Sequence, residues 1–474
     1  MNTVPLVVDL DGTLLHSDLL LETGMSFVRN NPISCLRPVN WLRKGKAHLK
    51  EQLAISTSVD VSTLPYNETV VEFLKKQREA GRVLILATAS HSTLAERVAS
   101  HFGIFDHVHS SDGHINLTAK HKRDLLVERY GPGGYDYMGN SHDDICVWES
   151  ARYAYVVDPD SGVERKAMRG GNVLEVMQTP KATTRAWIKA FRLHQWMKNT
   201  LIFVPLLAAH QVTNLSLFMD GIVAFVLFGI CASSVYILND LLDLADDRHH
   251  KTKRNRPFAS GKLSIASGVL VFPLLLVIAF AGALTILPEE FSIALGTYYL
   301  LTLAYSLSLK RMMGVDVIAL ALLYTMRIIA GAYAFQLVLT FWVLAFSMFI
   351  FLSLALVKRY AELREARVKG LKGKTRGRGY FPGDLEMIAS LGAASGYLAV
   401  MVLALYLHDT VTMAMYAHPQ VIWLACPALL FWITRVWILT HRGEMHDDPV
   451  IFAIRDRTSL MTGLVFCLIF WLAA

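Results

Sequence analysis

The sequence predicts two joined parts, an N-terminal α/β domain built on a doubly wound parallel sheet and a C-terminal all-α bundle of about nine transmembrane helices. The first observation is composition: 53% of the 474 residues are hydrophobic and the mean hydropathy is +0.38, more apolar than an ordinary soluble protein. The second is distribution, because residues 1–195 read as globular sequence whereas residues 200–474 fall into long apolar runs. We therefore expect a multidomain, multi-pass membrane protein.

In the N-terminal part, apolar runs typical of buried strands alternate with helical patterns. PLVVDLDGTLL and RVLILATAS flank the helical VVEFLKKQREAG, and YDYMGNSHDDI and YAYVVD predict two further strands. This alternation favours a doubly wound sheet whose chemistry lies at the carboxyl ends of its strands. A helical, basic insertion at about 19–64 is expected to form a cap, which either rests on the membrane surface or is solvated; the surface contacts would be Trp41, Arg43, Lys44 and Lys46.

Nine apolar runs in the second half are predicted as spans, since most reach the roughly 17–25 residues that a helix needs to cross a bilayer. They lie near 200–217, 218–238, 266–288, 291–309, 315–336, 340–357, 385–407, 419–440 and 459–474. The expected domains are an α/β domain over 1–178, a linker over 179–190 and a transmembrane domain over 191–474.

Basic residues are placed asymmetrically among the connections between these spans. The segments at 248–262, 310–311, 358–378 and 441–457 are rich in Lys and Arg, whereas AHQVTN, LPEE, FQLVLT and HDTVTMAMYAHP contain none. This pattern satisfies the positive-inside rule when the N-terminal domain is cytosolic. Five cysteines without a CxxC pair fit the same reducing compartment. We expect a multi-pass protein of the cell (inner) membrane.

A pair of carboxylates marks the first predicted strand. Asp9 and Asp11 stand two apart at its end, so both side chains point out of the same strand end, where a magnesium ion and a nucleophile can be assembled. The DLDGTL motif resembles the haloacid dehalogenase-like phosphatase superfamily, over roughly residues 4–160.

The resemblance implies roles by position. Asp9 would be the nucleophile and Asp11 the acid/base, with both also at the metal; Thr88 would hold the phosphate, and Asp144 would support the metal. Lys122 would steady the charge, with Lys120 as the alternative. One departure matters, because the family's acidic loop usually begins Gly-Asp and this chain has Gly139 and Asn140. Both an active phosphatase and a weakened or structural domain stay open.

A second acidic row follows the second predicted span. Asp240, Asp243 and Asp247 repeat at i, i+3 and i+7, which places them on one face of a helix. A charge deep in a membrane helix costs about 2.5–3.5 kcal/mol, so a row at the membrane edge makes sense if a divalent metal binds it. Mg²⁺ is suited to a few carboxylates plus phosphate oxygens, and the basic cluster that follows supplies cations for a polyphosphate. That cluster comprises Arg248, Lys251, Lys253, Arg254 and Arg256.

This aspartate pattern with its basic cluster resembles the UbiA-type intramembrane prenyltransferase superfamily, over about 195–474. RLHQWMKN, AYSLSLKR and LVKRYAEL are similar to the branch of polyprenyl-phosphate (decaprenyl-phosphate) phosphoribosyltransferases. The resemblance implies Mg²⁺-dependent transfer of a phosphoribosyl group from phosphoribosyl diphosphate to a polyprenyl phosphate. Asp240, Asp243 and Asp247 would be catalytic through the metal that they bind. Further substrate-binding candidates are Arg192, Lys198, Asn239, Arg254, Lys310, Lys358 and Arg359.

Several alternatives remain at this stage. A prenyltransferase that moves a polyprenyl chain from its diphosphate to an aromatic or other lipid acceptor would use the same aspartates, but the stretch KRYAELREARVKG is basic where such enzymes place a second aspartate motif. A transporter or scaffold is the non-enzymatic alternative. Arg327 is an intramembrane charge with either a substrate or a structural partner, and Asp447, Asp448 and Asp456 are expected on one face, where they would bind a second metal or ribose hydroxyls.

The fused phosphatase-like domain would dephosphorylate the lipid-linked ribose 5-phosphate. The expected partners are the membrane, a polyprenyl phosphate and phosphoribosyl diphosphate; no nucleic acid is expected, and an oligomer is left open. Lipid length and the identity of the donor sugar are not fixed by the sequence.

Overall fold

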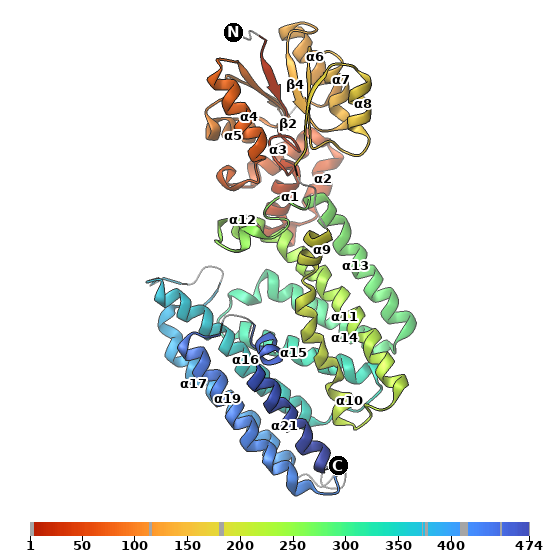
Figure 1. Ribbon diagram of the computed structural model, residues 1–474, viewed down its shortest axis with the longest axis vertical. Coiled ribbons are helices and arrows are strands. Elements are labelled where there is room, and N and C mark those ends of the chain that lie inside the picture. Colours follow the sequence, from red (N-terminus) through yellow and green to blue (C-terminus); the bar gives the residue numbers. More distant parts are fainter. Residues whose placement is uncertain are drawn as a thin grey trace. The chain divides into compact units, whose positions relative to one another are not determined.

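The computed structural model describes residues 4–112, 116–179, 184–371, 373–374, 378–407, 416–445 and 448–473 (Figure 1). The chain divides into two compact units, Met1–Phe191 with Tyr236–Phe272, and Arg192–Val235 with Pro273–Ala474. The first unit therefore contains the N-terminal domain and the aspartate-rich segment. Asp447 and residues 180–183 of the predicted linker lie outside the described residues, and the linker's second half is helix α9 (Thr184–Phe191).

The N-terminal domain is built on a six-stranded parallel sheet in the order β3-β2-β1-β4-β5-β6. Its strands are β1 (Leu6–Val8), β2 (Leu84–His91), β3 (His107–Ser111), β4 (Asp136–Gly139), β5 (Ala154–Val157) and β6 (Val173–Met177). The four predicted strands form its centre, so the predicted doubly wound fold is confirmed. The sequence did not reveal the edge strands β3 and β6, because an edge strand faces solvent and its residues are not a continuous apolar run.

Helices cover both faces of this sheet. They are α4 (Glu68–Glu79), α5 (Ser92–Phe102), α6 (Ala119–Tyr130), α7 (Ile145–Trp148) and α8 (Val163–Arg169). Successive residues of a strand point to opposite faces. Leu6 and Val8 accordingly join one apolar core, whereas Val7 joins a second core on the other face. The two cores fix the sheet between its helices and hold the ends of the strands in place.

The predicted cap consists of α1 (Leu19–Asn30), α2 (Arg37–Arg43) and α3 (Lys46–Ser56). Helix α1 begins at Asp18, whose carboxylate accepts the backbone N–H groups of Leu20 and Leu21. Trp41 is half-buried and packs on Phe27, with ring centroids 5.1 Å apart. The exposed apolar side chains of the cap are instead Ile33, Leu36, Val39, Leu42 and Ile55.

The aspartate-rich segment begins at the end of the long helix α11 (Leu215–Leu242) and continues through α12 (Leu244–His249) and the 3-10 turn η5 (Lys253–Asn255). Asp243 stands between the two α-helices as the N-cap of α12. The N–H of Asp243 still donates to the carbonyl of Asn239 and that of Asp247 to the carbonyl of Asp243. The predicted single helix face is therefore interrupted at Asp243 without losing its i to i−4 bonding.

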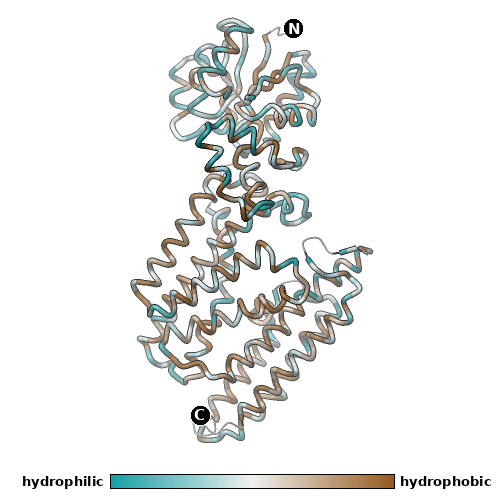
Figure 2. Tube along the Cα trace, turned by 180° about the vertical axis from the view of Figure 1, so that it is seen from behind, coloured by the Kyte–Doolittle hydropathy of each residue, from teal (hydrophilic) through white to brown (hydrophobic). Residues whose placement is uncertain are grey.

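The transmembrane part continues with α13 (Ile265–Ile286), α14 (Glu289–Leu307), α15 (Val315–Ala334), α16 (Phe341–Val368), α17 (Leu385–Tyr406), α19 (Ala425–Arg442), α20 (Pro449–Arg455) and α21 (Arg457–Ala473). Within the described residues six helices are long and apolar enough to cross a membrane, or seven if α20 and α21, bent by 80°, form one span. Figure 2 shows hydrophobic colouring along most of these helices.

The first predicted span is not one helix. Residues 200–217 contain the end of the 3-10 stretch η4 (Leu193–Phe203), the short helix α10 (Val204–Ala208) and the start of α11. Pro205 lacks an N–H and therefore starts a new helix, and His210, with φ of 55°, lies in a left-handed conformation that ends it. The predicted count of nine spans is therefore approximate.

Candidate functional sites

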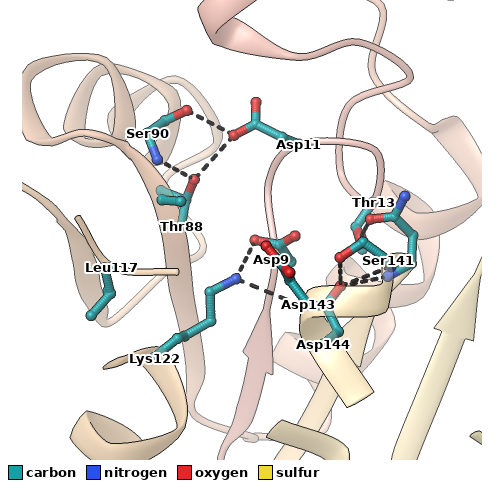
Figure 3. A network of polar contacts seen from close by, with 12 residues as sticks. Asp9, Asp11, Thr13, Thr88, Ser90, Leu117, Lys122, Ser141, Asp143 and Asp144 are labelled. Carbon is teal, nitrogen blue, oxygen red and sulfur yellow. Dashed lines mark hydrogen bonds and ion pairs between the residues drawn. The ribbon is translucent and has the colours of Figure 1, made fainter. Parts of the chain in front are cut away.

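The first site lies at the carboxyl end of the central strand β1. Asp9 follows that strand and accepts a hydrogen bond from Nζ of Lys122 at 2.8 Å (Figure 3). Lys122 is buried on α6 and also donates to the hydroxyl of Tyr137 at 2.9 Å. Lys120, the alternative cation, lies two residues earlier on the same helix and is exposed. The structure thus brings Lys122, rather than Lys120, to the carboxylate predicted as the nucleophile.

Asp144 completes the acidic side of this site. Its Oδ2 accepts from the backbone N–H groups of Asn140 and Ser141 at 3.0 and 2.9 Å, and from the hydroxyl of Ser141 at 2.8 Å. Its Oδ1 accepts from the Tyr137 hydroxyl at 2.7 Å and lies 3.7 Å from Nζ of Lys122. Three elements, β1, β4 with its following turn, and α6, therefore hold Asp9, Asp144 and Lys122 together.

Asp11 faces the end of the neighbouring strand β2. Its Oδ2 accepts from the hydroxyls of Ser90 at 2.7 Å and Thr88 at 3.3 Å, and its Oδ1 accepts the N–H of Leu19 at 2.8 Å. Sequence reasoning proposed Thr88 but missed Ser90. The signal was present, because residues two apart on a strand point to the same side.

Burial dominates the electrostatics of these acids. It raises the pKa of Asp9 to about 7, although the ammonium of Lys122 acts in the opposite direction. Burial likewise raises the pKa of Asp11 to about 6, and the nearby Asp18 carboxylate adds to that rise. A buried carboxylate is costly unless a cation compensates it. A donor set of buried carboxylate oxygens with raised pKa values therefore fits a divalent cation such as Mg²⁺.

Asn140 occupies the position where the resemblance expects an aspartate. Its Oδ1 accepts from the Thr13 hydroxyl at 3.3 Å, and a Cβ built on Gly12 would come within 2.4 Å of its Nδ2. Gly12, with φ of 76°, is therefore needed both for the turn and for this close approach. The amide keeps an oxygen at this position but removes one negative charge.

The second site contains the aspartates of the α11–α12 segment. Asp240 and Asp247 are both buried and share one guanidinium, since Nη1 of Arg256 lies 3.1 Å from Asp240 and 2.6 Å from Asp247. Burial raises the pKa of Asp247 to about 6, although Arg256 opposes that rise. Asp243 has a different partner, with its Oδ1 lying 3.3 Å from Nη1 of Arg29. The structure thus brings together two members of the predicted row and turns the third toward the cap.

The other predicted residues of this segment lie at its rim. Asn239 is partly exposed on α11, and Arg254 is exposed in η5. Among the residues that the structure describes, no three His, Cys, Asp or Glu side chains are already gathered around one metal position. The single guanidinium of Arg256 compensates only part of the charge of the two buried acids, and carboxylates of this kind are suited to a metal together with a diphosphate.

Two predicted lysines meet at one carboxylate in the second unit. Nζ of Lys198, from η4, and Nζ of Lys358, from α16, lie 2.7 and 3.2 Å from Oδ2 of Asp448, which caps α20. The hydroxyl of Tyr324 donates to the same carboxylate at 2.9 Å. Three helices and one turn, far apart in the sequence, therefore converge on Asp448.

A cavity of about 500 Å³ opens beside this cluster. Its walls carry charges of both signs, and its lining includes Lys358, Glu362, Arg364, Glu365, Lys369 and Asp448. Asp456 does not join it, because Asp456 pairs with Arg435 at 2.6 Å at the other end of α20. The predicted grouping of Asp448 with Asp456 is therefore wrong: α20 separates the two carboxylates and each has its own basic partner.

The remaining predicted cations are placed differently. Arg359 is fully buried between Asp316 and Glu362, with Nη2 lying 2.5 Å from Oδ2 of Asp316. Arg359 follows Lys358 in the sequence but lies on another side of α16. Its two acidic partners favour a structural role for Arg359. Arg192 caps η4 and Lys310 lies in η6 (Leu309–Arg311), both partly exposed.

Arg327 lies inside the bundle among neutral groups. Its guanidinium donates to Oδ1 of Asn199 and to the hydroxyl of Tyr298, each at 3.1 Å, and it stacks 4.9 Å above the ring of Tyr298. Because Asn199 follows Lys198 in η4, Arg327 holds the turn that presents Lys198. The intramembrane charge thus supports the cluster on Asp448.

Comparison with known proteins covers both parts of the chain. The sequence model of the UbiA prenyltransferase family matches residues 200–470. An uncharacterized protein of Sinorhizobium fredii is 37% identical over 99% of this chain and 91% of its own. Nodulation protein NoeC of Azorhizobium caulinodans is 38% identical over 60% of this chain and 92% of its own, and decaprenyl-phosphate phosphoribosyltransferase of Mycobacterium tuberculosis is 29% identical over 61% and 95%.

The family match spans more than half of the chain and includes the last residues of η4, the aspartate row, α16 and Asp448. The N-terminal sheet, with its acids at the end of β1 and a helical cap after that strand, agrees with the haloacid dehalogenase-like resemblance of its motif. The chain therefore belongs to the UbiA prenyltransferase family, with an α/β domain joined to the N-terminal side of its transmembrane part.

Proposed function

We propose that this protein transfers the phosphoribosyl group of phosphoribosyl diphosphate to a polyprenyl phosphate in a Mg²⁺-dependent reaction. The observation that carries the proposal is the convergence of Lys198 and Lys358 on Asp448, beside a cavity lined by further basic residues. A prenyl diphosphate presents one phosphate-rich end. Phosphoribosyl diphosphate and a lipid phosphate together present a diphosphate and two separate monophosphates, which need a second cationic site.

We assign the diphosphate to one site and the monophosphates to the other. Asp240, Asp243 and Asp247 would hold the leaving diphosphate through Mg²⁺, with Arg254 and Arg256 beside it. Lys198 and Lys358 would bind the 5-phosphate or the lipid phosphate in place of their present contact with Asp448. Bound Mg²⁺ would supply charge neutralisation for the diphosphate as it departs.

The reaction needs no protein nucleophile. An oxygen of the lipid phosphate forms a bond to C1 of the ribose while the bond from C1 to the diphosphate oxygen breaks, and the configuration at C1 inverts. The electron pair leaves with the diphosphate, so no proton has to move. The protein's contribution is to bind both anions with basic side chains, which offset the repulsion between the two reactants.

The sequence relatives support this choice. The decaprenyl-phosphate phosphoribosyltransferase of Mycobacterium tuberculosis is 29% identical over 95% of its own length. One observation favours the alternative, a prenyltransferase with an aromatic or other lipid acceptor: Asp448 is a buried carboxylate after a late helix and would serve a second metal there. The two lysines on that carboxylate oppose this alternative, because they already neutralise it.

For the N-terminal domain we propose phosphomonoester hydrolysis, with the lipid-linked ribose 5-phosphate as substrate. An Asp9 oxygen attacks phosphorus as the bond to the ribose oxygen breaks, and Asp11 protonates the leaving oxygen. Burial raises the pKa of Asp11 to about 6, so a larger fraction of this carboxyl carries a proton near neutral pH than of an ordinary aspartate. Water then releases phosphate from Asp9 with Asp11 as the base. The basic connections between the spans support a cytosolic position for this domain, in a protein that we propose for the inner membrane.

The test uses purified full-length protein in lipid vesicles with Mg²⁺, labelled phosphoribosyl diphosphate and a polyprenyl phosphate. We expect a labelled lipid by chromatography, lost in Asp240→Ala and retained in Asp9→Ala. Asp220→Ala, on the same helix α11 but near its start, is the matched control and should retain transfer.

The same vesicles also distinguish the alternative. Consumption of a prenyl diphosphate with an aromatic acceptor, without any labelled lipid from phosphoribosyl diphosphate, would contradict the proposal and establish prenyl transfer. Lys198→Ala and Lys358→Ala should raise the KM for a phosphorylated substrate more than they lower kcat, because they are proposed to bind rather than to react.

A further inference from the structure

Helix α1 of the cap lies against the aspartate-rich segment within one compact unit. Three ion pairs make the contact, one through Glu22 and two through Arg29. Residues seven apart lie on the same face of a helix, so a single face of α1 meets this segment. The segment in question carries the aspartates predicted to bind the transferase metal.

Arg29 fixes the break between α11 and α12. Its Nη1 donates to the carbonyl of Leu242 at 3.1 Å and lies 3.3 Å from Oδ1 of Asp243, and its Nη2 donates to Asp246. A planar guanidinium that bonds to three groups at once restricts all of them. Arg29 thereby constrains both the backbone before Asp243 and the direction of its carboxylate.

Glu22 anchors the other end of the contact. Its two carboxylate oxygens accept from Nη2 and Nη1 of Arg248 at 2.6 and 3.0 Å, with side-chain exposures of 4% and 6%. The hydroxyl of Ser17 donates to the same carboxylate at 2.6 Å, and Nε of Arg248 donates to the carbonyl of Ala259 at 3.0 Å. A buried, bidentate and fully bonded pair holds the segment in one register on α1.

The N-terminus of α1 is attached to the other predicted site. Oδ1 of Asp11 accepts the N–H of Leu19, the first residue of α1. One short helix of 12 residues therefore touches an acid of the phosphatase-like site at its start and an acid of the transferase site near its end.

We propose that α1 of the fused domain forms part of the transferase's metal site, with Arg29 as a positioning residue for Asp243. This inference rests on the proposed function of the aspartate-rich segment. Arg29 holds Asp243 and the end of α11, and the pair of Glu22 with Arg248 holds α12, so that the segment carrying the three aspartates keeps one backbone arrangement. Transfer then requires the contact of α1 with the aspartate-rich segment, but it does not require phosphatase chemistry at Asp9.

The experiment is a charge exchange between Arg29 and Asp246, which is not one of the predicted metal ligands. Arg29→Asp and Asp246→Arg are each made in the full-length chain, singly and together. We expect Arg29→Asp to raise the Mg²⁺ concentration for half-maximal transfer about tenfold, as loss of groups that orient metal ligands commonly does. The double variant should recover most of that loss. Arg78→Asp is the matched control and should behave as wild type. Arg78 lies on α4, and the substitution breaks an exposed ion pair with Asp106.

Two readouts do not depend on activity. Hydrogen exchange of residues 240–249 in metal-free protein should accelerate in Arg29→Asp and slow again in the double variant. Mn²⁺ binding followed by electron paramagnetic resonance, in an Asp9→Asn background that weakens the N-terminal site, should show the same loss and recovery.

The outcomes separate this inference from the proposed function. Unchanged Mn²⁺ affinity and unchanged exchange in Arg29→Asp would overturn the positioning role, whatever the enzyme transfers. Wild-type protein that fails with phosphoribosyl diphosphate would overturn the proposed function, whereas a loss and recovery of Mn²⁺ affinity would still support positioning of the metal site by α1.

Discussion

The acidic residues at the candidate sites are compensated by basic side chains from other elements. Lys122 donates to Asp9, Arg256 bridges Asp240 and Asp247, and Lys198 contacts Asp448. An uncompensated buried carboxylate would be costly, so each basic partner keeps its acid in place until a metal ion takes over part of the compensation. The strength of these pairs therefore bears directly on metal affinity.

The substitution Asn140→Asp is expected to strengthen the phosphatase-like site. It restores the missing carboxylate beside Thr13, so Mg²⁺ should bind more tightly and phosphomonoester hydrolysis should accelerate about tenfold or more. The measurement is phosphate release from a soluble phosphomonoester over a range of Mg²⁺ concentrations. Asn172→Asp, at a site bonded to the carbonyls of Trp148 and Ala151, is the matched control. An unchanged Mg²⁺ requirement in Asn140→Asp would show that position 140 does not contribute to the metal site.

Metal binding at Asp9 is expected to depend on pH. Burial raises the pKa of Asp9 to about 7, so a proton competes with the metal below that pH and leaves as the pH rises. Mg²⁺ affinity should therefore increase about tenfold between pH 6 and pH 8. Calorimetry in buffers of different ionisation enthalpy measures both the affinity and the released proton. Asp9→Asn should abolish most of this dependence, and a flat profile in wild type would contradict the raised pKa.

At the scale of elements, the turn η4 presents Lys198 because α15 packs closely against it. A Cβ added to Gly331 of α15 would come within 2.0 Å of the carbonyl oxygen of Ile202 in η4. Backbone atoms cannot yield as a flexible side chain does, so Gly331→Ala must push η4 away from α15. The same helix carries Arg327, which bonds to Asn199 of that turn.

Gly331→Ala should therefore lower stability by about 1–3 kcal/mol and also reduce transfer, because Lys198 moves with η4. Gly463→Ala is the matched control, since nothing lies within 4 Å of the added Cβ and alanine favours a helix. Thermal unfolding in detergent and the transfer assay measure the two effects. Equal unfolding temperatures for both variants would show that η4 is not held by this contact.

The sequence predicted those elements whose burial produces a clear hydrophobic pattern. Continuous apolar runs identified the central strands, since both faces of those strands are buried. The same rule could not reveal β3 and β6 at the sheet edges, nor the break of the first span at Pro205. Spacing placed Asp9 beside Asp11, but only tertiary structure could join Lys198 to Asp448, because 250 residues separate them.

At the scale of the whole molecule, the chain combines two sites whose proposed reactions follow one another. The product of phosphoribosyl transfer is a lipid that carries a phosphomonoester, and the N-terminal domain has the acids for hydrolysing such a group. The lipid tail confines this intermediate to the membrane, where the local concentration near the fused domain stays high. Under this proposal, fusion serves the second step by proximity.

This arrangement predicts the outcome of separating the two activities. Asp9→Asn should accumulate the phosphorylated ribosyl lipid, and Asp240→Ala should form no lipid product. When both variants share the same vesicles, the dephosphorylated lipid should appear after a lag, because the intermediate must diffuse from one protein to the other. Wild type, at the same number of each active site, should show a shorter lag.

In separate vesicles the pair should yield only the phosphorylated lipid, since the long tail prevents exchange between bilayers. Dephosphorylated lipid formed at the wild-type rate by Asp9→Asn alone would remove the N-terminal domain from the reaction sequence and leave its fold as a support for the aspartate-rich segment.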